Sequence, residues 1–477
     1  MSDLIWESAV SLAARLRAKQ VSAVEVLNAF YTQIERMNPG LNALVNLLDP
    51  ADARRLAVKA DESLARGDEV GPLHGLPMAP KDLIDARGFP TTSGFVPFAD
   101  RVASRDCALV SRQRRAGAIL IGKSNVPEFG LGSHTFNSLF GTTRNPYDLD
   151  KTAGGSSGGA AVALASGMLP IADGSDMGGS LRNPASFCNV VGLRPSAGRV
   201  PYERDFGWFA RLSTSGPMAK TVADAALLLS AQAGPFPADP LTLDVPGSDF
   251  RKPLEGDLSG VRLAWSPNLD LVPVDGRVTS VLEKSLPVFE QLGCTVAGAC
   301  PELSEAMAVF QVQRAAGLAV LGDTLDRTEP GWRSHAKDTL MWNIEKGLAL
   351  SARELLASEM IRTKIYHQLE NFFADFDALL LPAAQVPPFP AEQDWVREIN
   401  GQPMETYIDW MTICCAISVT GLPAISVPAG FTDEGLPIGL QIVGKPRGDF
   451  ELLQLAHGFE QATEHYRRKP DLSTTPV

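Results

Sequence analysis

The sequence predicts an α/β fold in which a mixed, largely parallel central β-sheet is surrounded by helices. Short apolar runs of strand length alternate with amphipathic helical patterns along the chain, which is typical of this fold class. Hydrophobic residues make up 45% and charged residues 21% of the 477 residues, as in a globular protein with a sizeable core. No low-complexity linker divides the sequence, so we expect one domain over residues 1–477.

The first part of the chain predicts two helices. Ser22 and Glu25 form a capping-box pattern, and apolar residues continue one helical face until residues 38–40, where Asn-Pro-Gly is expected to end the helix. A second helix is expected to begin after residues 49–50 and to stop near Gly67, because proline favours the first helical turn and glycine favours the position after the last turn.

Later segments predict the sheet and a helical region beside it. The strand-like apolar runs are residues 119–121, 169–172, 190–193, 261–265, 379–381, 424–427 and 438–443. Helical patterns lie between several of them, for example over residues 160–165 and 278–291. Residues from about 303 to 376 are mostly helical in pattern, and we expect them to form a cap over a site.

Two glycine-rich segments and one lysine offer the groups that acyl transfer requires. Residues 154–159 are GGSSGG, residues 176–180 are DMGGS, and Lys81 lies upstream in the apolar segment LPMAPKD. The glycines of DMGGS would let successive N–H groups face one point, as an oxyanion hole requires, with Ser180 beside them as the nucleophile. Lys81 would accept a proton if burial kept it neutral near pH 7, and Ser156 is the natural relay. The pattern predicts a serine hydrolase without a catalytic histidine.

Each segment alone has a simpler interpretation. GGSSGG is more often a flexible linker, GGS is more often a turn, and a single lysine is more often a surface cation. Here GGSSGG leads directly into the apolar, helix-forming residues 160–165, whereas a linker would lead into a polar stretch or a new domain. The three segments together favour the catalytic interpretation.

The chain resembles the amidase signature hydrolases, and specifically their free-standing bacterial type, over nearly its whole length. The segments that carry the resemblance are GGSSGG, residues 176–182, Pro184, residues 191–196, Lys81 with its context, and residues 421–428. The resemblance implies the α/β fold of this family. It also implies hydrolysis of a carboxamide to a carboxylate and ammonia or an amine, with no cofactor and no metal.

The resemblance implies a role for each motif residue. Lys81 becomes the general base, Ser156 the bridging serine after a cis Gly155–Ser156 peptide, and Ser180 the acylated nucleophile. The backbone N–H groups expected to form the oxyanion hole belong to Met177, Gly178, Gly179 and Ser180. Position 177 commonly holds a small or β-branched residue in relatives, so we expect this pocket wall to differ.

The substrate is predicted only by class. Aromatic residues expected near the site favour an amide with an aryl or hydrophobic acyl or amine group, although esters and carbamates share the same tetrahedral chemistry. The candidate pocket residues are Gly130, His134, Phe136, Phe206, Trp208, Phe209 and Trp342. Each aromatic ring would equally well pack in the core.

Four alternatives stay open. The glutamine-hydrolysing A subunit of a tRNA-dependent amidotransferase shares these motifs and passes ammonia to a partner, but residues 200–209 do not resemble that protein. Residues 117–124 match the written P-loop pattern of nucleotide-binding proteins, yet their apolar centre predicts a buried strand, so we interpret the match as false. A Ser-His-Asp triad would use His134. A catalytically inactive binding protein would not be acylated at Ser180.

Charge and composition limit the partners. A net charge of −12 and a pI near 5.1 argue against a nucleic-acid surface. The six histidines lack metal-binding spacing, and the six cysteines lack a Cys-x-x-Cys pair, which favours buried thiols in a reducing compartment.

The N-terminus lacks a secretory pattern, and the uncharged residues 152–172 and 411–432 contain glycine, serine or proline, so we expect a cytoplasmic protein that does not insert into membranes. The expected partner is a small-molecule amide, and a homodimer stays open.

Overall fold

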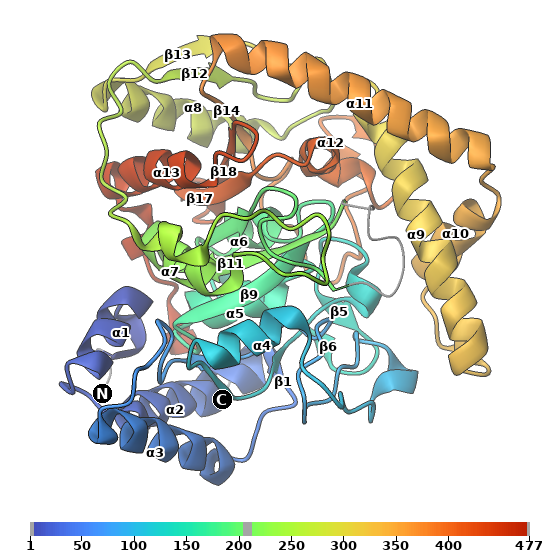
Figure 1. Ribbon diagram of the computed structural model, residues 1–477. Helices are drawn as coiled ribbons and strands as arrows, with labels where there is room; N and C mark the ends of the chain where they lie inside the picture. Colours follow the sequence, from blue (N-terminus) through green and yellow to red (C-terminus); the bar gives the residue numbers. More distant parts are fainter. Residues whose placement is uncertain (1–3, 204–211, 475–477) are drawn as a thin grey trace.

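A single mixed sheet lies at the centre of the computed structural model, which describes residues 4–203 and 212–474, and helices surround it (Figure 1). The sheet has eight strands in the order β13-β12-β14-β18-β17-β10-β11-β9. Their bounds are β9 Ile171–Asp176, β10 Val191–Arg194, β11 Thr214–Ala219, β12 Arg262–Trp265, β13 Thr295–Gly298, β14 Ala378–Pro382, β17 Ala424–Phe431 and β18 Pro437–Gly444. The alternation of apolar runs and helical patterns therefore predicted the fold class correctly.

The expectation that this sheet is largely parallel is wrong. Among its described strands, β12 pairs in parallel with β13 and β14, whereas the pairs β14–β18, β18–β17, β17–β10, β10–β11 and β11–β9 are antiparallel. Every residue of β14 and β18 is buried. Strands covered on both faces give continuous apolar runs whatever their direction, so the apolar pattern carried no information on strand direction.

The N-terminal helices are α1 Ala9–Arg17, α2 Ala23–Leu41 and α3 Pro50–Arg66. The Ser22–Glu25 capping box is present, and α3 begins after its Asp49 cap and ends at Gly67, as predicted. Helix α2, however, continues through Pro39. A proline removes one hydrogen bond to the preceding turn, and Pro39 lies in the last turn of the helix, where this loss is local. The Asn38 side chain accepts hydrogen bonds from the N–H groups of Ala43 and Leu44 at 3.0 and 2.8 Å, which stabilises the helix end.

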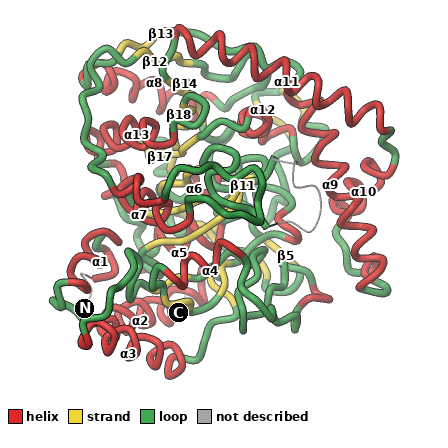
Figure 2. The backbone as a smooth tube through the Cα atoms, in the orientation of Figure 1, coloured by secondary structure: helices red, strands yellow, loops and turns green. Residues whose placement is uncertain are grey.

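Most other helices pack on the sheet or in the core. They are α4 Ala108–Arg115, α5 Gly158–Ala165, α6 Arg182–Phe187, α7 Val222–Gln232, α8 Gly276–Gln291, α12 Thr412–Thr420 and α13 Asp449–Thr463. Helices α5, α6 and α12 are buried along their whole length. Helix α5 contacts β9 and α6, and α6 contacts β10, whereas α12 lies closer to the long helix near the end of the molecule (Figure 2).

The region from 303 to 376 is mainly helical, as predicted. It consists of α9 Ala306–Thr328, α10 Asp338–Leu348 and α11 Ala352–Asp375. In Figure 1 the long helix α11 crosses one end of the molecule from near β13, and α9 and α10 lie side by side at the periphery. Helix α9 also contacts α12.

Short strands complete the fold. They are β1 Leu44–Val45, β2 Pro77–Met78, β3 Ile119–Leu120, β4 Lys123–Ser124, β5 Phe136–Asn137, β6 Gly141–Thr142, β7 Arg144–Asn145, β8 Asp148–Thr152, β15 Glu398–Ile399 and β16 Gln402–Pro403. All six cysteines are free thiols. Within the described residues, we find no helix with both the length and the apolar character needed to cross a membrane.

Candidate active site

Lys81 follows β2 and is completely buried. Its backbone N–H donates to Asp173 Oδ1 on β9 at 2.8 Å, which fixes the chain at this point. The Nζ atom donates to Ser156 Oγ and Ser157 Oγ, each at 2.8 Å, and lies 3.1 Å from both the carbonyl oxygen and the Oγ atom of Ser175. The structure therefore brings Lys81 to Ser156, as expected, and adds two serines that the sequence analysis did not identify.

Burial controls the protonation of Lys81. Desolvation lowers the pKa of Lys81 to about 7, although the negative charges of Asp176 and Asp173 oppose this shift. Burial also raises the pKa of Asp173, whose carboxylate accepts hydrogen bonds from the Lys81 N–H and from Gln113 Nε2. A large fraction of Lys81 is therefore neutral near pH 7, and its nitrogen can accept a proton.

The GGSSGG segment is a tightly packed turn into α5. The Gly155–Ser156 peptide bond is cis, as the family resemblance implied. A Cβ atom at Gly159 would lie 2.3 Å from the backbone nitrogen of Asn125, a distance that no side chain can adopt without backbone movement. Close packing therefore explains the glycines, and the flexible-linker interpretation does not apply.

Gly159→Ala is expected to destabilise the protein because the added methyl group would displace the Asn125 backbone. Overpacking typically costs about 1–3 kcal/mol, and we expect the upper end of this range because the neighbour is main chain. Urea unfolding monitored by fluorescence measures the effect. Gly317→Ala is the matched control, since Gly317 is also helical but has no atom within 4 Å of the added Cβ. Equal stability of the two variants would contradict the packing argument.

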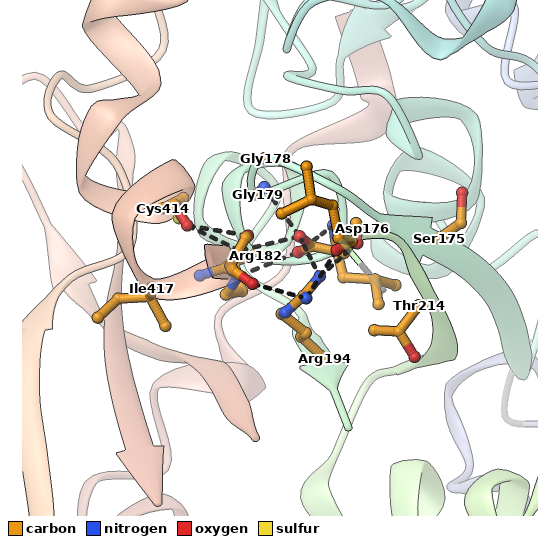
Figure 3. Close-up of polar contacts among 12 residues, drawn as sticks. Ser175, Asp176, Gly178, Gly179, Arg182, Arg194, Thr214, Cys414 and Ile417 are labelled. Atoms are coloured by element: carbon orange, nitrogen blue, oxygen red, sulfur yellow. Dashed lines mark hydrogen bonds and ion pairs between the residues drawn. The ribbon is translucent and has the colours of Figure 1, made fainter. Parts of the chain in front are cut away.

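Asp176 ends β9 and organises the loop that follows it (Figure 3). Its Oδ1 accepts a hydrogen bond from the Gly179 N–H at 2.9 Å, and its Oδ2 accepts one from the Leu181 N–H at 3.1 Å. Arg182 donates to both carboxylate oxygens at 2.8 and 3.0 Å, and Arg194 donates to Oδ1 at 3.2 Å. Burial opposes ionisation of Asp176, but the two guanidinium groups hold its pKa well below the usual range.

The loop anchored by Asp176 carries Ser180 into α6. Within residues 4–203 and 212–474, the backbone N–H groups of Met177, Gly178 and Ser180 have no hydrogen-bond acceptor. Gly179 differs, because its N–H already donates to Asp176. The Ser180 carbonyl oxygen accepts a hydrogen bond from the Ser157 N–H at 3.3 Å, which holds this loop against the GGSSGG turn. Three of the four expected oxyanion donors are therefore available, and the fourth fixes the loop.

A cavity of about 40 Å³ lies beside Ser180. Gly130 and Met177, both expected at the site, line it, and a Cβ atom at Gly130 would lie 3.4 Å from Ser156 Oγ. Lining residues that the sequence analysis missed include Leu131, Ser133, Phe310, Arg314, Tyr407 and Met411. Several of them lie more than 100 residues from the motifs along the chain, and they carried no recognisable local pattern.

A larger cavity of about 420 Å³ adjoins the first one. Two expected pocket residues, His134 and Phe136, line it. The residues that border both cavities are Leu131, Gly132, Ser133 and Tyr407. A substrate held at Ser180 could therefore extend past this shared wall into the larger space.

His134 is engaged on both sides of its ring. Its Nε2 lies 2.9 Å from the carbonyl oxygen of Ala391, and its Nδ1 lies 2.7 Å from Thr152 Oγ1. Burial lowers the pKa of His134 to about 4. Both ring nitrogens thus face neutral structural partners, which is not the arrangement of a Ser-His-Asp triad.

Trp342, the other expected aromatic residue among those described, lines neither cavity. Trp342 lies behind the wall, with its ring centroid 6.1 Å from that of Tyr407 and 5.6 Å from Arg314 Cζ. Phe206, Trp208 and Phe209 lie outside the described residues. Most of residues 200–209, which we expected to distinguish this chain from the A subunit of the tRNA-dependent amidotransferases, lies there too.

The P-loop match at residues 117–124 has a structural explanation. Its centre forms β3, and Lys123 lies in β4, where its buried Nζ donates to the Ile84 carbonyl oxygen and to Thr91 Oγ1 and lies 3.8 Å from Asp82. The next helical element is a 3-10 turn, Glu128–Gly130, rather than the α-helix that a phosphate-binding loop requires. The structure therefore agrees with the prediction that the match is false.

Several known enzymes are similar to this chain in sequence and fold. The amidase family model matches residues 25–453. The acylamidase of Rhodococcus erythropolis is 36% identical over 472 residues, with 98% of each chain covered. The A subunit of the glutamyl-tRNA(Gln) amidotransferase of Carboxydothermus hydrogenoformans is 33% identical over 493 residues, with 98% of this chain and 100% of that protein covered. The crystal structure of a bacterial aryl acylamidase of the amidase signature family matches with a TM-score of 0.90 at 30% identity, covering 99% of each chain.

Proposed function

The chain belongs to the amidase signature family of hydrolases that act on amide bonds, and we propose that it cleaves carboxamides bearing an aryl or hydrophobic group through a Ser–Ser–Lys triad. One observation carries the proposal. Lys81 Nζ is completely buried, lies 2.8 Å from Ser156 Oγ, and has a pKa lowered to about 7, next to the loop of Ser180. The similarity to an acylamidase and the apolar wall formed by Leu131, Phe310 and Met411 support the substrate class.

Acylation begins with the substrate carbonyl carbon beside Ser180. Neutral Lys81 accepts the proton of Ser156 Oγ while Ser156 Oγ accepts the proton of Ser180 Oγ, so that Ser180 Oγ attacks the carbonyl carbon. The negative oxygen that forms is stabilised by the free N–H groups of Met177, Gly178 and Ser180. Lys81 then returns the proton through Ser156 to the amide nitrogen, the C–N bond breaks, and an amine leaves.

Deacylation uses the same residues, with water in place of Ser180 as the nucleophile and Ser180 Oγ as the leaving group. A water molecule loses a proton to Lys81 through Ser156 and attacks the Ser180 ester, and the tetrahedral intermediate again places its oxygen on the three N–H groups. The ester bond breaks as Ser180 Oγ regains a proton, and a carboxylic acid is released. No step requires a group other than these residues and water.

The pH profile of the wild-type enzyme follows from the base. We expect kcat/KM for a neutral anilide to rise about tenfold per pH unit below pH 7 and to level off above it, because only neutral Lys81 accepts a proton and its pKa is about 7. Initial rates of aniline release between pH 5 and pH 9 measure this profile. A profile that is flat from pH 5 to pH 9, as expected for a base such as His134 with a pKa lowered to about 4, would contradict Lys81 as the base.

The proposed function is tested by product release from the purified chain without added nucleotide. The substrates are an anilide, a benzamide, a short aliphatic amide, an aryl carbamate and glutamine, and the control protein is Ser180→Ala. We expect turnover of the hydrophobic members, none by the variant, and an acyl-enzyme mass on Ser180 after acid quenching. Turnover that survives in Ser180→Ala would overturn the assignment of the nucleophile.

The similarity to the glutamyl-tRNA(Gln) amidotransferase gives a second candidate, a glutaminase that works with a partner. It predicts that glutamine alone among the five compounds is hydrolysed, and that the rate depends on an added amidotransferase partner. Anilide cleavage by the isolated chain would argue against it.

A further inference from the structure

Arg314 places a positive charge on the wall of the Ser180 cavity. This charge has no role in the proposed acylation and deacylation steps. Arg314 lies on α9, is only 4% exposed, and lines the cavity together with Ser180. Its Nη1 donates to Tyr407 Oη at 2.7 Å, and its Nη2 donates to Gln311 Oε1 at 3.1 Å. Both acceptors are neutral, so neither balances the charge of the guanidinium.

Other arginines buried to this extent have a carboxylate partner. These ion pairs are Arg182–Asp176 at 2.8 Å, Arg194–Asp176 at 3.2 Å and Arg199–Asp449 at 2.9 Å. Arg314 differs, because no carboxylate oxygen of residues 4–203 or 212–474 lies within 4.0 Å of its nitrogens. A buried charge is normally paired, so the position of Arg314 on a cavity wall points to a partner that arrives with the substrate.

Three aromatic rings hold the Arg314 guanidinium in place. Its Cζ atom lies 5.8 Å from the ring centroid of Phe310 and 5.6 Å from those of Trp342 and Tyr407. Cation–π contacts orient the group, and the surrounding rings exclude water, which strengthens its attraction for an anion. The Nε atom of Arg314 also has no hydrogen-bond partner among the described residues, so its N–H group has not been used as a donor.

We propose that the cavity beside Ser180 selects amides whose acyl group carries a carboxylate, which pairs with Arg314. The inference rests on the proposed function, since it narrows the substrate class of the same site. Ser180 and Arg314 line the same cavity, so a short chain would join the acyl carbon to the carboxylate. The acyl group stays on Ser180 after the first step, so the hydrophobic amine leaves through the larger cavity that Phe136 lines.

A matched pair of anilides tests the charge. Succinanilate carries a carboxylate where 4-methylpentananilide carries an isopropyl group of similar shape, and both release aniline. We expect wild-type kcat/KM to be at least about tenfold higher for succinanilate, and Arg314→Gln to lose about a hundredfold on succinanilate, mainly through KM, but less than about threefold on the neutral anilide. Arg314→Lys should recover part of the loss, because it restores the charge.

The control variant is Arg327→Gln, an exposed arginine at the end of the same helix, and it should not change the ratio between the two substrates. An equal loss on both anilides in Arg314→Gln, or a wild-type preference for the neutral anilide, would overturn the inference. If Arg314→Gln does not fold, Arg314→Lys is tested instead. Lysine keeps the positive charge but lacks the paired N–H donors of the guanidinium, so this variant should lower kcat/KM for succinanilate more than for the neutral anilide.

Binding to Ser180→Ala separates the two proposals. Calorimetric titration should show succinanilate bound by Ser180→Ala and binding at least about tenfold weaker in Ser180→Ala/Arg314→Gln. Wild-type cleavage of the neutral anilide without Arg314-dependent binding would leave the proposed function intact and overturn the carboxylate inference. Arg314-dependent binding without cleavage of any amide would support the inference and overturn the proposed reaction.

Discussion

Lys81→Met should lower kcat/KM for any amide substrate by about a thousandfold to ten-thousandfold, and Ser180→Ala should remove acylation altogether. Methionine keeps much of the volume of the buried lysine stem but has no amine to accept a proton from Ser156. Ser180→Ala removes the atom that bonds to the acyl group. Ser156→Ala should also impair turnover, because it removes the hydroxyl that lies 2.8 Å from Lys81 Nζ and would relay the proton.

Steady-state rates and intact-protein mass spectrometry measure these effects together. Wild type quenched during turnover should carry the acyl mass, Lys81→Met should acquire it slowly, and Ser180→Ala should never acquire it. Near-normal turnover by Lys81→Met would refute the assignment of the base.

Lys123→Met is the matched control for the loss of a buried amine. Lys123 is as completely buried as Lys81, but its Nζ contacts the Ile84 carbonyl oxygen and Thr91 rather than Ser156 and Ser157. We expect lower stability from this variant because Asp82 loses its ion-pair partner. Its activity per folded molecule should stay within about threefold of wild type. Comparable inactivation of both lysine variants would point to a structural role for Lys81.

The sequence predicted the elements of the fold better than their directions. Capping residues and glycines mark helix ends by local physics, so the ends of α3 and the start of α2 were predictable from Asp49, Gly67 and Ser22. Strand direction depends on how distant segments pair. The antiparallel neighbours β17 and β18 are buried on both faces, and their apolar runs could equally belong to parallel strands.

In the candidate site, too, residues marked by local sequence were predictable, whereas residues brought in by distant packing were not. Lys81 and Ser156 lie in segments with unusual local composition, and the structure brings them within hydrogen-bond distance. Arg314 and Tyr407 gave no such signal, because a charged residue in a helical pattern normally faces solvent and a single tyrosine normally packs in the core. Tertiary packing brings them to the cavity, where Arg314 on α9 donates to Tyr407 Oη, 93 residues away along the chain. The Asp176 side chain likewise accepts the hydrogen bond of the Gly179 N–H, which no spacing rule reveals.

Asp176→Asn should lower the free energy of unfolding by about 3–5 kcal/mol, the typical consequence of removing one partner from a buried ion pair. The amide has nearly the shape of the carboxylate, but Arg182 and Arg194 would be left buried without a negative charge. The loop would also lose the charged acceptor of the Gly179 and Leu181 N–H groups. We therefore expect activity to fall along with stability, because these bonds hold the loop of Ser180.

Urea unfolding at several pH values tests the charge rather than the shape. The pKa of Asp176 is lowered in the folded protein from an ordinary value of 3.8, so its contribution to stability is fully present above about pH 5 and is lost as the pH falls toward the folded-state pKa. The stability difference between wild type and Asp176→Asn should accordingly stay constant from pH 5 to pH 8 and shrink only below about pH 4.

Asp52→Asn is the control, because its ion pair with Arg55 is exposed on the surface of α3, with 47% and 71% of the two side chains accessible. Such pairs contribute about 0–1 kcal/mol, and this variant should unfold like wild type. If Asp176→Asn behaved in the same way, the buried ion pair would not hold the loop. Loss of activity with wild-type stability would instead mean that Asp176 acts on the orientation of the free N–H groups alone, and the expected change would then be in kcat rather than KM.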